Sequence, residues 1–191
     1  MKTWANITLR QAQELLNLGE MDELDLVINQ MAIIRDTTIE EIEKLTPKEL
    51  IDFTKEYEFL NKTPKPKLTK TFKKGGIRYG IMDFDKLTLA QMVDIEEYYA
   101  DSFQLNMHKI MSCLYLETQS YNFITKKYKL KEYEPSKERE DIFLDMDMEF
   151  IWENILFFYH IEQSYLKGMK AFLDKMKAEM TTKKLEPEDL Q

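Results

Sequence analysis

The chain has little of what several structural classes require. Its 191 residues include one cysteine, five glycines and five prolines. Disulfide-rich, collagen-like and turn-rich all-β proteins need more of these residues, and disordered chains are poorer in apolar residues than the 43% found here. A chain of this length can bury a core without covalent cross-links. Cys113 has no second cysteine to pair with, which fits a reducing compartment.

The sequence also lacks a recognisable export or membrane segment. Its first residues contain neither the apolar run nor the cleavage site of a secretory signal. The most apolar stretch, residues 154–161, is far shorter than the roughly 20 residues that a membrane span requires. We therefore expect no membrane partner.

Residues that could support catalysis are scarce. The two histidines, His108 and His160, do not form the Glu-x-x-His pairs of a di-iron bundle. Neither a nucleophile elbow nor a phosphate-binding glycine loop occurs. The sequence therefore predicts no enzyme, no cofactor and no metal site.

What the sequence does contain is helical periodicity. Apolar residues recur at helical spacing over residues 1–61, which predicts three or four short helices, and Thr46-Pro47 is a typical helix start. Residues 62–83 break this rhythm, and partial alternation on both sides of Gly75-Gly76 predicts a β-hairpin at about 67–82. A pair of helices is expected over 84–116, the first capped by Thr88 and the second following Asp101.

The last third of the chain predicts an arm, a long helix and a tail. Residues 117–140 are polar and predict a loop-like arm that could bind a partner. A heptad pattern over residues 141–180 predicts one long helix, whose wide apolar stripe favours the centre of a bundle over a coiled coil. Residues 181–191 form a polar tail. The expected fold is mainly α and a single domain, a helical bundle around this C-terminal helix with one inserted β-hairpin.

Charge is distributed unevenly along the chain. Residues 62–78 carry seven basic residues and no acid, which leaves 20 basic against 35 acidic residues elsewhere, a net charge of −15. Such a basic hairpin could contact an acidic protein, an acidic copy of the same chain or nucleic acid, or it could protect an exposed sheet edge. A second basic patch within residues 126–131 is a weaker signal. The residues predicted to bind a partner are Lys70, Lys73, Lys74 and Arg78 of the hairpin, and Tyr121, Phe123 and Tyr128 of the arm.

Residues 76–115 resemble a known group of proteins. They combine the short strand Gly76-Ile77-Arg78-Tyr79-Gly80, the helix start Leu-Thr-x-x-Gln-x-x-Asp at 87–94, and His108-Lys109 followed by Leu114-Tyr115. This middle part resembles small proteins encoded among the structural genes of tailed bacteriophages, including the crAss-like phages of gut Bacteroidales.

The resemblance implies a non-enzymatic role in the virion or in the host cytoplasm. The chain would be a virion-associated component or a tail-assembly chaperone that contacts head, portal or tail proteins. Association with copies of itself fits the same role. The alternative is a nucleic-acid-binding accessory or regulatory protein that uses the basic hairpin.

Overall fold

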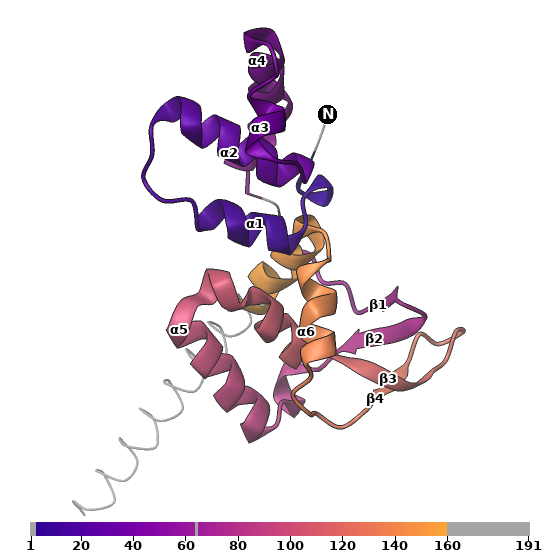
Figure 1. Ribbon diagram of the computed structural model, residues 1–191. Helices are drawn as coiled ribbons and strands as arrows, with labels where there is room; N and C mark the ends of the chain where they lie inside the picture. Colours follow the sequence, from indigo (N-terminus) through magenta and orange to yellow (C-terminus); the bar gives the residue numbers. More distant parts are fainter. Residues whose placement is uncertain (1–2, 64, 160–191) are drawn as a thin grey trace, which may run out of the picture.

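The computed structural model describes residues 3–63 and 65–159. The helices are α1 (Leu9–Leu16), α2 (Glu23–Arg35), α3 (Ile39–Ile42), α4 (Pro47–Glu56), α5 (Leu89–Leu114) and α6 (Lys137–Leu144), with 3-10 turns η1 (Trp4–Asn6), η2 (Glu58–Asn61) and η3 (Phe84–Lys86). Residues 148–159 are also helical. The strands are β1 (Thr71–Lys74), β2 (Ile77–Ile81), β3 (Tyr115–Tyr121) and β4 (Tyr128–Leu130). Figure 1 shows an elongated molecule in which the N-terminal helices stand above α5, α6 and a β-sheet.

Side-chain caps determine where the N-terminal helices begin. The side chains of Thr8 and Thr46 each accept a hydrogen bond from the backbone N–H three residues later. The side chain of the Gln or Glu at that position in turn accepts one from the backbone N–H of the threonine. Asp22 caps α2 and Thr38 caps α3. The predicted series of short helices within residues 1–61 is confirmed.

The four strands form one antiparallel sheet in the order β1-β2-β3-β4. The predicted hairpin is confirmed, since β1 pairs with β2 across Gly75 and Gly76, whose φ angles of 57° and 82° favour glycine. The hairpin is not a separate projection, because β2 also pairs with β3 over Tyr79, Gly80 and Ile81. β2 is therefore an inner strand of the sheet.

Residues 117–140 differ from the predicted loop-like arm. They contain most of β3, all of β4 and the start of α6. The pairing of β3 with β4 shifts between Thr118 and Ser120, which interrupts the two-residue alternation that identifies a strand in sequence. The segment after β4 is also attached to α5, because the Tyr133 hydroxyl donates a hydrogen bond to Asp94.

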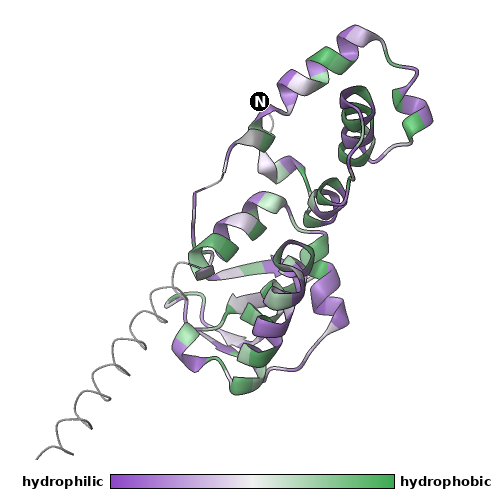
Figure 2. Ribbon diagram, turned by 90° about the vertical axis from the view of Figure 1, so that its left-hand side faces the viewer, coloured by the Kyte–Doolittle hydropathy of each residue, from purple (hydrophilic) through white to green (hydrophobic). Residues whose placement is uncertain are grey.

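Aromatic rings fill the space between the sheet and the helices. The ring of Phe72 in β1 lies 5.1 Å from that of Tyr79 and 5.4 Å from that of Tyr115, centre to centre. Phe143 of α6 and Phe150 in the helix at 148–159 lie 5.7 and 5.1 Å from Phe72. Figure 2 shows apolar residues recurring along the helices with polar residues between them. One face of the sheet thus belongs to the core, which leaves the opposite face for contacts.

The prediction of one unbroken helix over residues 141–180 is wrong. α6 ends at Leu144, and the chain turns before it becomes helical again at residue 148. At this break the backbone N–H of Leu9 donates to the carbonyl of Met146. The heptad spacing runs through the break, so the sequence pattern does not reveal it. Residues 160–180 of the predicted helix, and the predicted tail at 181–191, lie outside the described residues.

The break is caused by pairing with the N-terminal segment. Thr8 and Asp147 form an isolated antiparallel β-bridge, and the N–H of Met148 donates to the carbonyl of Ile7 at 2.7 Å. These bonds pair backbone groups of residues 146–148 that would otherwise form hydrogen bonds within a continuous helix.

The long helix at the centre of the fold is α5, so the prediction of a bundle around a C-terminal helix is also corrected. α5 begins at the predicted cap Thr88 and contains a kink at Ser102, whose φ of −166° and ψ of 105° are not helical. The predicted pair of helices, with its break after Asp101, corresponds to the two arms of this kink. The fold is mostly helical with α+β character. Neither α5 nor any other helix of the described residues is long and apolar enough to cross a membrane.

Candidate binding groove on the sheet

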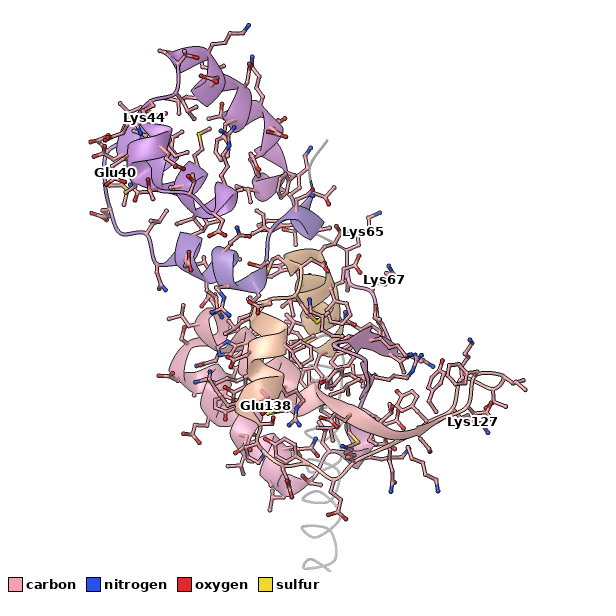
Figure 3. The ribbon with its side chains drawn as sticks, turned by 45° about the vertical axis from the view of Figure 1, so that its right-hand side comes forward. Glu40, Lys44, Lys65, Lys67, Lys127 and Glu138 are labelled. Atoms are coloured by element: carbon pink, nitrogen blue, oxygen red, sulfur yellow. The ribbon has the colours of Figure 1, made fainter. Side chains whose placement is uncertain are left out.

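A groove of about 880 Å³ lies beside the sheet, and six of the residues that line it are lysines. Its lysines come from three separate segments, namely the approach to β1, the turn η3 and the β3–β4 hairpin. They are Lys70, Lys86, Lys126, Lys127, Lys129 and Lys131, and we call this surface the lysine groove. Figure 3 shows Lys127 at the outer end of the sheet, far from Glu40 and Lys44 in the N-terminal helices. The folded chain therefore brings Lys70 of the first basic patch to the same groove as the second patch at 126–131.

Tyr128 forms part of the groove's wall and crosses the sheet to reach β2. Its hydroxyl donates a hydrogen bond to the carbonyl of Ile81 at 2.8 Å. Gly80 makes this approach possible, because a Cβ there would lie 2.6 Å from the Tyr128 ring. Burial raises the pKa of Tyr128, with Asp83 adding to the effect, so its phenol stays neutral. Tyr128, predicted as a partner-binding anchor, thus holds the groove's shape.

Acidic neighbours neutralise part of the lysine groove. Lys86 forms an ion pair with Asp83, and Lys131 forms one with Glu117. The other four lysines, at positions 70, 126, 127 and 129, make no ion pair with any residue that the structure describes. A cluster of cations without counter-charges attracts an anionic partner and is screened by salt.

Three other predicted residues meet at the outer end of the sheet. The guanidinium carbon of Arg78 lies 3.9 Å from the ring centre of Tyr121 and 5.6 Å from that of Phe123. The two rings meet edge to face with their centres 5.1 Å apart. Cation–π contacts of this kind hold the three side chains together. Tyr121 is the cross-strand partner of Tyr128, so this cluster adjoins the lysine groove.

The remaining predicted residues lie apart from the groove. Lys73 is exposed beside Arg78 in the β1–β2 pairing, and Lys74 Nζ donates to the carbonyl of Asp145 at 3.4 Å. Sequence reasoning missed Lys86 entirely, because no local pattern connects η3 with β4. If the sequence had predicted the second hairpin, β3–β4, it would also have placed the basic patch at 126–131 on the sheet.

The side chains with the greatest chemical reactivity are buried away from this groove. Burial raises the pKa of the Cys113 thiol to about 11, although a hydrogen bond between Cys113 and Tyr133 opposes the shift. At neutral pH this thiol is therefore protonated and poorly nucleophilic. Desolvation lowers the pKa of His108 to about 4, and nearby Lys109 acts in the same direction. No group of three metal-ligating side chains that could hold an ion occurs within residues 3–63 and 65–159.

The neutral state of His108 predicts a specific loss of stability in acid. The ring faces Lys109, Lys137, Arg10 and Asp141, and its Nδ1 lies 3.3 Å from Gln13 Nε2. The unfolded chain takes up a proton below pH 6.5, whereas the folded protein does so only near pH 4. The free energy of unfolding should fall by about 2 kcal/mol more between pH 7 and 5 than it does in His108→Gln.

Urea unfolding of both proteins at the two pH values, with an NMR titration of the His108 ring, checks this prediction. Equal pH dependence in the two proteins, or a ring that titrates near pH 6.5, would contradict it.

Comparison with protein-family models, with curated proteins and with solved structures found no match to this chain.

Proposed function

We propose that this chain is a non-enzymatic structural or assembly protein of a tailed bacteriophage, which holds an acidic segment of a partner protein in the lysine groove. One observation carries the proposal, namely the convergence of six lysines from three segments on a single groove. The groove also contains apolar side chains, among them Leu68, Met82 and Leu130, as a surface for protein segments requires. The phage assignment rests on the resemblance of residues 76–115.

The aromatic side chains favour a protein partner over a nucleic acid. Single-stranded nucleic acid binds by stacking its bases on open aromatic faces. Here Arg78 covers the ring of Tyr121, and the Tyr128 ring packs on Gly80. Phe123 is the exception, with an exposed ring beside a cation. This ring keeps a nucleic-acid-binding accessory protein as the second candidate.

Charge reversal in the lysine groove should abolish binding to an acidic segment. In Lys70→Glu/Lys129→Glu, two attractive charges become repulsive, and we expect affinity for a fluorescent peptide of about 20 glutamates to fall at least tenfold. Lys44→Glu/Lys48→Glu, in and before α4, introduces the same charge change far from the groove and is the control. Fluorescence anisotropy at low and physiological salt measures the affinities.

The outcomes separate the candidates. Unchanged binding in Lys70→Glu/Lys129→Glu would mean that these lysines only protect the sheet edge. Tighter binding of an oligothymidylate of about 20 nucleotides than of the glutamate peptide, with a steep salt dependence, would favour the nucleic-acid-binding function. Mass spectrometry of purified particles would then distinguish a virion component, present at a fixed copy number, from an assembly factor that is absent from them.

A further inference from the structure

The tip of the β3–β4 hairpin presents two apolar side chains to solvent. Phe123 is 67% exposed and Ile124 is 92% exposed. The loop itself is well ordered by hydrogen bonds, since Asn122 Oδ1 accepts from the N–H groups of Ile124 and Thr125 at 2.9 and 3.0 Å. Arg78 also lies over the Phe123 ring. A rigid, exposed apolar pair loses little conformational freedom on binding and is suited to insertion into a partner.

An apolar groove of about 410 Å³ lies at the other end of the molecule, between α2 and α4. Leu24, Val27, Leu50 and Ile51 line it, and Leu24 and Ile51 are 59% and 54% exposed. We call it the α2–α4 groove. Such a concave apolar surface has the size and chemistry to receive a few large side chains.

The two surfaces also have opposite charges. Lys126 and Lys127 follow the apolar pair in the hairpin tip, whereas Asp22 and Glu23 line the α2–α4 groove. Asp25, in the same turn as these acids, has a raised pKa because of its hydrogen bond to Asp22 and the repulsion between them. The carboxylates of Asp22 and Glu23 in the groove therefore complement the lysines of the tip.

One molecule cannot bring its own tip into its own groove. Figure 1 places α2 and α4 in the upper part of the elongated molecule, whereas the β3–β4 hairpin extends sideways from its lower part. Figure 3 shows the same separation between Lys127 and Lys44, which directly precedes α4. The contact is therefore available only between two molecules.

We propose that copies of this chain associate head to tail, with Phe123 and Ile124 of one copy inserted into the α2–α4 groove of the next. Lys126 and Lys127 would then face Asp22 and Glu23 across the contact. Because tip and groove are different surfaces, each bound copy keeps one of them free, so the contact propagates into a ring or an open chain. The proposed contact shares Lys126 and Lys127 with the lysine groove but uses neither Lys70 nor Lys129. Because only a few side chains of each copy take part, we expect the association to be weak and to depend on protein concentration.

Two pairs of surface substitutions test the contact in the full chain. Phe123→Ser/Ile124→Ser removes the tip, and Leu24→Ser/Ile51→Ser removes the apolar lining of the groove. All four side chains are more than half exposed, so both variants should fold. Leu89→Ser/Val93→Ser, an exposed apolar pair on α5, is the matched control. Sedimentation velocity from about 10 to about 500 µM measures association.

We expect the mean sedimentation coefficient of the wild type and of the control to rise with concentration. Each test variant should stay monomeric, with association at least tenfold weaker. A mixture of the tip variant with the groove variant retains one intact contact and should form dimers but nothing larger. This restriction to dimers is the signature of a head-to-tail contact.

Several results would overturn the proposal. A wild type that is monomeric throughout the range shows that the contact does not form. Association that survives in either test variant shows that the tip and the groove are not partners, and a mixture without dimers shows the same. Loss of association in the control to the same extent would assign the contact to α5 instead. None of these outcomes changes the expected effect of Lys70→Glu/Lys129→Glu on peptide binding, so the two proposals can fail separately.

Discussion

Replacement of Asn154 by leucine should lower the free energy of unfolding by about 3 kcal/mol. Asn154 is 1% exposed and connects three parts of the chain. Its Oδ1 accepts hydrogen bonds from the N–H of Thr69 at 2.7 Å and from the hydroxyl of Tyr115 at 2.8 Å, and its Nδ2 donates to the carbonyl of Phe150. Leucine leaves the partly buried N–H of Thr69 without this partner and removes one of the two acceptors near the Tyr115 hydroxyl, which costs more than the hydrogen bonds themselves contribute.

Urea unfolding at neutral pH measures this effect, with Asn17→Leu at the exposed end of α1 as the control. Tyr115→Phe should have a smaller effect than Asn154→Leu, because it removes one hydroxyl and leaves Thr69 N paired with Asn154. A change below 1 kcal/mol in Asn154→Leu would show that the three segments are held together by packing alone.

Gly80→Ala should destabilise the protein by about 2 kcal/mol, because the new methyl group would overlap the Tyr128 ring. The ring could move only by breaking its hydrogen bond to Ile81. Tyr128→Ala removes the ring that the new methyl group would overlap. In this background Gly80→Ala should therefore lower the free energy of unfolding by at least 1 kcal/mol less than it does in the wild type. Gly19→Ala, where no atom lies within 4 Å of the added methyl, is the control and should change stability by less than about 0.5 kcal/mol.

The double-mutant cycle is measured by urea unfolding of the four proteins. Equal costs of Gly80→Ala in both backgrounds would mean that Tyr128 is not the reason for glycine at this position. Because Tyr128 forms a wall of the lysine groove, Gly80→Ala should also weaken binding of the glutamate peptide.

Features that depend on neighbouring residues could be predicted from the sequence. The helix starts at Thr46 and Thr88 rest on a side chain three residues away, and the turn at Gly75-Gly76 rests on the freedom of glycine. The break after Leu144 could not be predicted, because its cause is pairing with residues 7–9 at the other end of the chain.

The residues of the site could be predicted only in part for the same reason, because contacts between segments far apart in the sequence bring them together. The sequence predicts Arg78, Tyr121 and Phe123 as separate contact residues, and only the β2–β3 pairing shows that they form one cluster. Lys70 and Lys129 are far apart in sequence, and the folded chain places both in the lining of one groove. Their chemistry was visible in the sequence, whereas their proximity required the tertiary structure.

The bridge between Thr8 and Asp147 has a consequence for the order in which the protein forms during synthesis. The segment that begins the chain completes its backbone pairing only with residues 146–148. Contacts of such large sequence separation close late, because a long loop must be ordered first. During synthesis, residues 7–9 therefore form this pairing only after most of the chain has been made. Until then the N–H of Leu9 and the carbonyl of Ile7 lack these partners and stay open to other proteins, including chaperones of the cell.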